Sequence, residues 1–185
     1  MKRLLDLLLS FTALVVFFVP FMIVALLVRL TSKGPIIYWS DRVGKNNKII
    51  KMPKFRTMKV DTPQLATHLI KSEDYLTSIG SFLRKSSLDE LPQLFSILKG
   101  DMTIVGPRPA LFNQDDLIEL RTKHGIHKLT PGLTGWAQIN GRDDLPIPEK
   151  VEFDLEYLNK KSVLFDIKII ILTFTKVILR KGVSH

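Results

Sequence analysis

The sequence predicts an α+β fold that is mainly helical, with an N-terminal re-entrant membrane helix-break-helix, amphipathic interfacial helices and one small β-hairpin. Three observations predict this class. Residues 7–28 carry no charge, two β-rich segments flank a turn-rich segment at residues 44–48, and helical patterns fill much of the second half of the chain. A chain of 185 residues has the length of one domain with an appendage.

The N-terminal apolar stretch is long enough to meet a lipid bilayer. As one straight helix it would reach about 33 Å, close to the thickness of the hydrocarbon core. Pro20 lies near its middle, where a proline bends or breaks a helix. Basic residues flank both ends and favour the cytoplasmic side for each of them. We therefore predict that the stretch enters and leaves one leaflet; a kinked span is the alternative, and the length of the run disfavours a cleaved signal peptide.

Short elements are expected next. Residues 36–39 and 49–52 are predicted to pair as a hairpin, and residues 62–80 are polar and predicted to be irregular or weakly helical. A helix is expected at about residues 89–99, because Gly100 after Lys99 provides a C-terminal stop.

Helices are predicted in the second half at about residues 112–124, 149–160 and 164–180. The last is mostly apolar, which suits a core helix or an interfacial one. Residues 130–148 contain three glycines and three prolines and are predicted to form a long ordered loop. Loops of that length are usually functional.

The composition combines positive charge with apolar character. The net charge is +9, the isoelectric point is about 9.8, and the mean hydropathy is +0.14. This combination indicates an anionic membrane surface or phosphorylated substrates as partners. Nucleic-acid signatures are absent, so no nucleic-acid partner is expected. The chain has no cysteine, which excludes disulfides and thiolate metal sites.

Adjacent carboxylates at Asp89 and Glu90 are the most informative local feature. Ser87 and Glu90 fit a capping box, but Pro92 would then fall inside the first turns of the helix. Asp89 as the N-cap avoids that conflict. Local rules alone favour capping, and they leave catalysis or cation binding as the alternative.

Basic residues recur in short turn-rich motifs, at Arg56, Arg84, Arg108 and Arg142. Arg108 lies between two prolines, and a rigidly held guanidinium suits bidentate binding of phosphate oxygens. Asp101 adds a third carboxylate near the pair in sequence. Asp89, Glu90 and Asp101 together could supply oxygen ligands to Mg²⁺, although Asp101 is equally explained as a turn residue.

The order of these motifs resembles the bacterial sugar transferases, and more narrowly the small monotopic polyprenol-phosphate phosphoglycosyl transferases. The motifs are Lys-Phe-Arg-Thr-Met, Ser-Leu-Asp-Glu-Leu-Pro-Gln-Leu, Lys-Gly-Asp-Met, Val-Gly-Pro-Arg-Pro and Pro-Gly-Leu-Thr-Gly-Trp-Ala-Gln-Ile-Asn-Gly-Arg. The resemblance covers nearly the whole chain.

The resemblance implies a reaction. The family transfers a sugar 1-phosphate from a UDP-sugar to undecaprenyl phosphate, releases UMP and initiates glycoconjugate or polysaccharide synthesis. By this likeness Asp89 would form a covalent phosphosugar intermediate, Glu90 would associate with Mg²⁺, and Arg108 would bind phosphate. The full sets of expected residues are Asp89, Glu90 and Asp101 for the metal, and Arg56, Arg84, Arg108, Gln138 and Arg142 for substrates.

The resemblance also implies an organisation. Residues 1–33 would be the membrane-inserted segment, and residues 34–185 a catalytic domain at the cytoplasmic face of the bacterial plasma membrane. The expected partners are the UDP-sugar, undecaprenyl phosphate and membrane lipid, and self-association is left open. Two rival hypotheses remain: a membrane-surface adaptor without enzymatic activity, and a glycosyltransferase that releases UDP instead of UMP.

Overall fold

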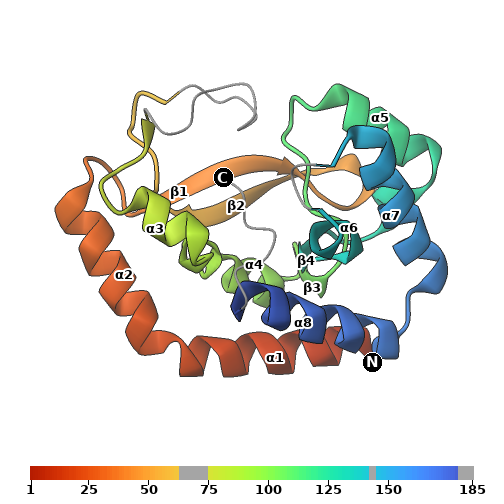
Figure 1. The fold of residues 1–185 in the computed structure, drawn as a ribbon, viewed down its shortest axis with the longest axis horizontal. Helices are drawn as coiled ribbons and strands as arrows, with labels where there is room; N and C mark the ends of the chain where they lie inside the picture. Colours follow the sequence, from red (N-terminus) through yellow and green to blue (C-terminus); the bar gives the residue numbers. More distant parts are fainter. Residues whose placement is uncertain (63–74, 142–144, 179–185) are drawn as a thin grey trace.

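The structure is a computed structural model that describes residues 1–62, 75–141 and 145–178. Helices dominate, with one antiparallel and one parallel two-stranded sheet among the described residues. In Figure 1 the first two helices line the bottom and left edge, and the antiparallel hairpin crosses the upper part. The prediction of a mainly helical fold with a small hairpin is confirmed.

The N-terminal apolar stretch forms two helices, α1 (Lys2–Val16) and α2 (Phe18–Thr31), which meet at a bend of 64°. The bend lies at Phe17 and not at Pro20, where the sequence predicted it. Pro20 has no N–H to donate to the Val16 carbonyl, and its ring crowds that carbonyl, so the helix breaks one turn ahead of the proline. No single helix in the described ranges is long and apolar enough to cross a bilayer; α1 and α2 meet that test only together.

The start of α1 is fixed to the rest of the chain by polar contacts. Lys2 Nζ forms an ion pair with Asp166 Oδ2 at 2.6 Å and donates to the Tyr157 hydroxyl at 3.1 Å. Asp6 is 5% exposed and accepts hydrogen bonds from the Thr103 hydroxyl at 2.7 Å and from the next backbone N–H at 2.9 Å. Because Asp6 and Asp166 are buried and need polar partners, these contacts define where α1 begins on the body.

The far end of the bent pair packs on the same body. Val24 and Val28 of α2 form a buried cluster with Phe55 and Leu83. Both ends of the apolar stretch are therefore joined to one folded unit.

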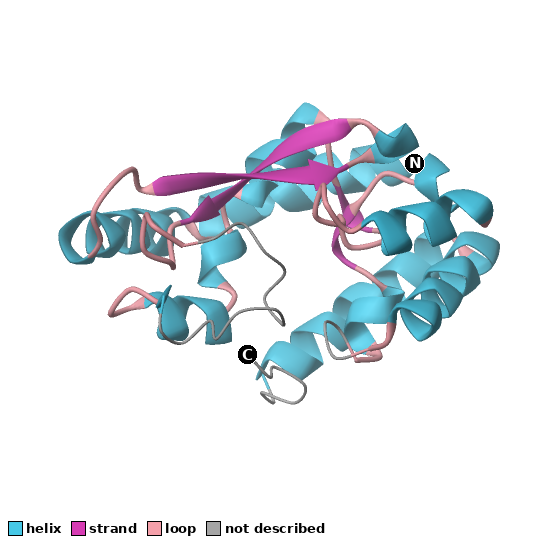
Figure 2. Ribbon diagram, turned by 90° about the horizontal axis from the view of Figure 1, so that it is seen from above, coloured by secondary structure: helices cyan, strands magenta, loops and turns pink. Residues whose placement is uncertain are grey.

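The hairpin consists of β1 (Ile37–Val43) and β2 (Ile49–Phe55), joined through the 3₁₀ turn η1 (Lys45–Asn47). Both strands are longer than predicted, because they continue through charged residues that pair on the outer face, such as Asp41 with Lys51 at 2.7 Å. Asn46 adopts a left-handed conformation, which asparagine tolerates better than most residues. Figure 2 shows the hairpin lying over the helices.

The centre of the chain contains α3 (Gly80–Lys85), the 3₁₀ turn η4 (Leu88–Glu90) and α4 (Gln93–Lys99). The predicted helix at 89–99 thus begins at Gln93, later than expected. Its predicted stop is confirmed, since Gly100 has φ of 100°. The Arg3 guanidinium donates to the carbonyls of Ile97 and Leu98 at the end of α4, at 2.6 and 2.7 Å.

The predicted loop at 130–148 is wrong in part, because it contains regular structure. Strand β4 (Gly132–Thr134) pairs in parallel with β3 (Thr103–Val105), and α6 (Trp136–Ile139) follows. A Cβ atom at Gly132 would lie 2.1 Å from the backbone nitrogen of Gly106, so the pairing requires glycine there.

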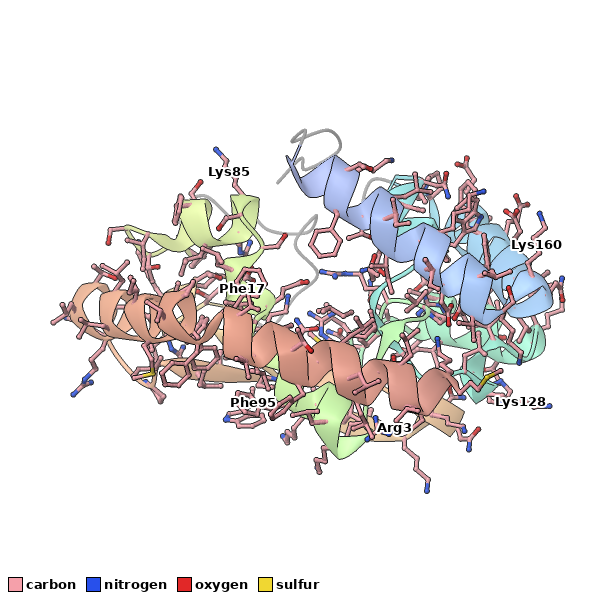
Figure 3. The ribbon with its side chains drawn as sticks, turned by 90° about the horizontal axis from the view of Figure 1, so that it is seen from below. Arg3, Phe17, Lys85, Phe95, Lys128 and Lys160 are labelled. Carbon is pink, nitrogen blue, oxygen red and sulfur yellow. The ribbon has the colours of Figure 1, made fainter. Side chains whose placement is uncertain are left out.

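The remaining helices are α5 (Asp115–Lys123), the 3₁₀ turn η5 (Ile126–Lys128), α7 (Ile147–Lys160) and α8 (Val163–Ile178). They confirm the three predicted C-terminal helices within the described residues. The underside of the molecule displays α1 and α8 (Figure 3). Both carry exposed apolar stripes, namely Leu4, Leu8, Phe11 and Val15 on α1 and Leu164, Ile167, Ile171 and Phe174 on α8.

Candidate active site

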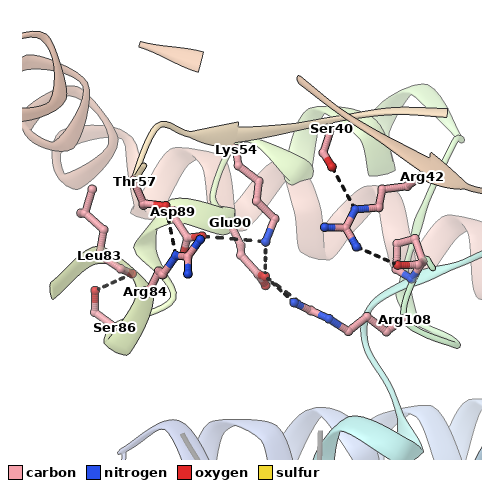
Figure 4. A network of polar contacts seen from close by, with 11 residues as sticks. Ser40, Arg42, Lys54, Thr57, Leu83, Arg84, Ser86, Asp89, Glu90 and Arg108 are labelled. Atoms are coloured by element: carbon pink, nitrogen blue, oxygen red, sulfur yellow. Dashed lines mark hydrogen bonds and ion pairs between the residues drawn. The ribbon is translucent and has the colours of Figure 1, made fainter. Parts of the chain in front are cut away.

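One face of the β1–β2 hairpin covers the site. Side chains alternate between the two faces of a strand, so Lys54 shares a face with Met52, and their register with β1 adds Ser40 and Arg42 to that face. Met52 packs against α4. Lys54 is thereby directed toward the turn that precedes α4 (Figure 4).

That turn holds the two adjacent carboxylates. Ser87 adopts a left-handed conformation with φ of 55° and starts η4, which places Asp89 and Glu90 under the hairpin. The two side chains are buried, with residue exposures of 6% and 9%. Both capping interpretations are wrong: neither Ser87 nor Asp89 forms a side-chain cap, and Pro92 is the N-cap residue of α4. The carboxylates are thus available for contacts across the site.

Cationic side chains surround the pair (Figure 4). Lys54 Nζ lies 2.8 Å from Glu90 Oε1 and 3.8 Å from Asp89 Oδ2. The Arg108 guanidinium reaches the same Glu90 oxygen at 3.4 Å. Arg84 donates from Nε to the Thr57 hydroxyl at 3.2 Å, beside Asp89. The predicted residues Asp89, Glu90, Arg84 and Arg108 therefore come together in one site.

Burial and charge act against each other at Asp89. Burial raises the pKa of the Asp89 carboxyl, Lys54 opposes that rise, and the Glu90 carboxylate adds to it. Burial likewise lowers the pKa of the Arg84 guanidinium, and Asp89 opposes that change. A buried carboxylate whose ionised form depends on nearby cations is a frequent feature of catalytic groups.

A buried ion pair supports the loop that carries Arg108. Arg121 of α5 contacts Asp154 of α7 from two nitrogens, at 2.9 and 2.6 Å, and donates from Nη1 to the Arg108 carbonyl at 2.8 Å. Burial raises the pKa of the Asp154 carboxyl, and Arg121 opposes the rise. Pro107 and Pro109 restrict the backbone on either side of Arg108, in addition to the hydrogen bond from Arg121.

Other predicted site residues lie apart from the pair. Arg56 donates from Nε to the Pro35 carbonyl at 2.8 Å, where α2 leads into the hairpin. Gln138 donates to the Leu133 carbonyl at 3.0 Å and so braces β4 against α6. Arg142 lies outside the described residues.

Asp101 does not join Asp89 and Glu90. It follows the opposite end of α4, which is about 10 Å long, and forms an ion pair with Lys99 at 2.9 Å. Within the described ranges, no group of three or more His, Cys, Asp or Glu side chains is placed to hold a metal ion. The three-carboxylate set predicted from the sequence is therefore corrected to the adjacent pair.

The pair still suits magnesium chemically. Mg²⁺ prefers hard oxygen ligands and is often held by one or two carboxylates together with substrate phosphates, without a complete protein cage. Asp89 and Glu90 present such oxygens side by side, next to cations that suit phosphates.

Sequence reasoning missed Lys54 as a site residue and did not single out Arg42, which shares its face of the hairpin. Lys54 lies in the Lys-Phe-Arg-Thr-Met motif, in which the sequence pattern points to Arg56. The signal that could have identified Lys54 is strand alternation, because Lys54 falls on the same face as the buried Met52. Arg42 lay beyond the predicted end of its strand.

Comparisons with known proteins identify the family of the chain. Residues 1–180 match the family model described as bacterial sugar transferase. The chain is 46% identical over 167 residues to the UDP-glucose:undecaprenyl-phosphate glucose-1-phosphate transferase of Escherichia coli (strain K12), which covers 86% of this chain and 36% of that protein. It is 39% identical over 187 residues to the uncharacterized sugar transferase EpsL of Bacillus subtilis (strain 168), covering 100% of this chain and 91% of that protein. It is 36% identical over 197 residues to the exopolysaccharide production protein ExoY of Sinorhizobium fredii, covering 98% and 87%.

Proposed function

Because the chain belongs to the bacterial sugar transferase family, we propose that it transfers a sugar 1-phosphate from a UDP-sugar to undecaprenyl phosphate and releases UMP. The names of similar enzymes support this reaction, and the Escherichia coli relative uses UDP-glucose. A product of this type would serve exopolysaccharide or capsule synthesis, as the name of ExoY suggests for that relative.

The single observation that carries the proposal is the buried Asp89–Glu90 pair under Lys54 and Arg108. A diphosphate repels a carboxylate nucleophile, so attack requires cations that neutralise the phosphate oxygens. The site places such cations around two carboxylates. A surface adaptor would have no need for ionised groups at this depth, since burying charge costs stability.

The reaction would proceed in two displacements at the same phosphorus atom. An Asp89 oxygen attacks the phosphorus that carries the sugar, the bond to the bridging oxygen breaks, and UMP departs with that oxygen. A phosphate oxygen of undecaprenyl phosphate then attacks the phosphorus of the phosphosugar–Asp89 acyl phosphate, the bond from phosphorus to the Asp89 oxygen breaks, and the Asp89 carboxylate is released. Splitting one difficult transfer into two in this way is the general advantage of a covalent nucleophile.

Each neighbouring residue has a proposed role. Lys54 and Arg84 keep Asp89 ionised, and Arg108 binds phosphate oxygens with its planar fork. Glu90 and Asp89 would hold Mg²⁺, which would supply further neutralisation of phosphate charge. The acceptor phosphate lies at the headgroup level of a membrane, which supports a membrane-surface location with lipid against the apolar helices. The basic residues that flank the apolar stretch support the cytoplasmic face of the plasma membrane.

The test measures which nucleotide is released. Purified protein is mixed with undecaprenyl phosphate, Mg²⁺ and a panel of UDP-sugars that begins with UDP-glucose, and UMP and UDP are quantified separately. We expect UMP, which disappears with Asp89→Asn and with chelator. UDP as the product would indicate ordinary glycosyl transfer, and neither nucleotide across the panel would favour the adaptor hypothesis.

A further inference from the structure

The structure assigns Arg42 a role that the sequence did not suggest: we propose that it binds the phosphate of the departing UMP. The inference rests on the proposed function and extends it to the leaving group. Arg42 lies in β1, on the face of the hairpin that covers the Asp89–Glu90 pair.

Two hydrogen-bond contacts orient the Arg42 side chain. Its Nε donates to the buried Ser40 hydroxyl at 3.0 Å, and Nη1 lies 3.4 Å from the Pro109 carbonyl. Arg42 is only partly buried. The guanidinium points back along the hairpin toward Lys54 and beside the loop of Arg108 (Figure 4). Arg42 therefore adds a fourth cation to Lys54, Arg84 and Arg108.

The contacts arrange these groups in a series. Arg84 and Asp89 stand at one end, Lys54 joins Asp89 to Glu90, and Glu90 contacts Arg108. Arg42 contacts the Pro109 carbonyl and lies on the other side of Lys54 from Arg84 and Asp89 (Figure 4). The proposed nucleophile and Arg42 thus lie at opposite ends.

In-line displacement at phosphorus relates the positions of Asp89 and Arg42 to the attacking and leaving groups. The attacking and leaving oxygens lie on opposite sides of the transferred phosphoryl group. With Asp89 on one side, the departing phosphate is directed toward the other end, where Arg42 lies. A guanidinium presents several N–H donors in a plane and stays charged, so it suits the negative charge that develops on the leaving group.

The experiment separates the leaving group from the acceptor. UMP affinity is measured directly, and exchange of labelled UMP into UDP-sugar without lipid reports the first displacement alone. For Arg42→Gln we expect UMP binding to weaken about 10-fold or more and exchange to slow, with the KM for undecaprenyl phosphate unchanged. Arg42→Lys should recover part of the loss because it keeps the charge.

Matched variants exclude a purely structural explanation. Lys51→Gln removes the same charge from the opposite face of the hairpin and should bind UMP as the wild type does. Glutamine carries an N–H at the position of the arginine Nε and can still bond Ser40. A bracing role through that bond predicts that Arg42→Gln exceeds Arg42→Lys in UMP affinity, which would overturn the proposal. A raised KM for lipid with unchanged UMP affinity would also overturn it. A wild-type protein that neither binds UMP nor releases it would instead contradict the proposed function.

Discussion

The ionised form of Asp89 lowers the stability of the fold, and the proposed reaction requires that form. Its pKa is raised in the folded chain, first by burial. Between the unfolded and folded pKa values the folded chain therefore binds more protons, and the free energy of unfolding falls as the pH rises through that window. At neutral pH an ionised Asp89 is a cost to the fold that the proposed chemistry requires.

Removing this charge should make the protein more stable and inactive. For Asp89→Asn we expect the loss of UMP release and a Tm higher by about 2–4 °C, the shift that ~1 kcal/mol produces in a chain of this size. Thermal unfolding in detergent and the nucleotide assay measure both. Asp41→Asn, at a more exposed carboxylate on the outer face of the hairpin, is the control and should change neither. A lower Tm together with wild-type rates would contradict the assignment.

Lys54 should set the pH range in which Asp89 is ionised. Because Lys54 lowers the pKa of Asp89 against the effect of burial, Lys54→Met should raise that pKa. The acidic limb of the rate profile then moves to higher pH, since a protonated carboxyl is no nucleophile. We also expect kcat to fall about 10²-fold, as when one preorganised donor is lost.

The measurement is UMP release across acidic and neutral pH. Lys51→Met provides a matched control. Lys51 lies in the same strand as Lys54 but on the outer face of the hairpin, and its ion pair with Asp41 is exposed. A reduced kcat with an unchanged acidic limb of the rate profile would show that Lys54 does not control the ionisation of Asp89.

At the scale of elements, α5 and α7 act on the site through the Arg121–Asp154 ion pair. Arg121 holds the Arg108 carbonyl, so the packing of two helices fixes a loop of the site. Removing one partner of a buried pair leaves an uncompensated charge and costs about 3–5 kcal/mol. Asp154→Asn should therefore lower the Tm and raise the KM for UDP-sugar.

A milder variant keeps this prediction testable if Asp154→Asn does not fold. Arg121→Lys keeps the charge but loses the planar fork, so we expect a smaller loss of Tm with the KM still raised. Lys160→Met removes an exposed ion pair from α7, the helix that carries Asp154, and should change the free energy of unfolding by less than about 1 kcal/mol. An unchanged KM in folded Arg121→Lys would show that the ion pair serves stability alone.

Elements governed by local rules were predictable, and those governed by distant contacts were not. Gly100 ends α4 as expected because a left-handed stop depends on one residue. The bend was predicted at Pro20 but lies at Phe17, because the effect of Pro20 falls on the carbonyl four residues earlier. The pairing of β3 with β4 joins short strands far apart in the sequence, and no local pattern marks it.

The candidate site divides in the same way. The motifs identified Asp89, Glu90, Arg84 and Arg108, which the fold brings together. Asp101 is close in sequence to this group, but α4 places it at the other end of a helix. Lys54 required knowledge of which strand face packs on α4, which is a property of tertiary structure.

At the scale of the whole molecule, the bent α1–α2 pair is joined to one body at both of its ends. Lys2 is held by Asp166, and Val28 packs with Phe55 and Leu83. A span would place these two ends on opposite sides of a hydrocarbon core about 30 Å thick. One body cannot bind both ends in that arrangement without losing one set of contacts, so we expect both ends on the same side of the membrane, which under the proposed function is the cytoplasmic side.

Labelling of single cysteines decides between the topologies, because the chain has no cysteine of its own. One variant carries a cysteine ahead of Met1, the second is Lys33→Cys, and the third is Phe17→Cys at the bend. With a membrane-impermeant maleimide, the first two should react in inverted membrane vesicles and stay unlabelled in right-side-out vesicles. Phe17→Cys should be protected in both if the bend lies within lipid. Labelling of the two ends from opposite sides would establish a span, and it would require the contacts at one end, either Lys2 with Asp166 or Val28 with Phe55 and Leu83, to be absent in the membrane.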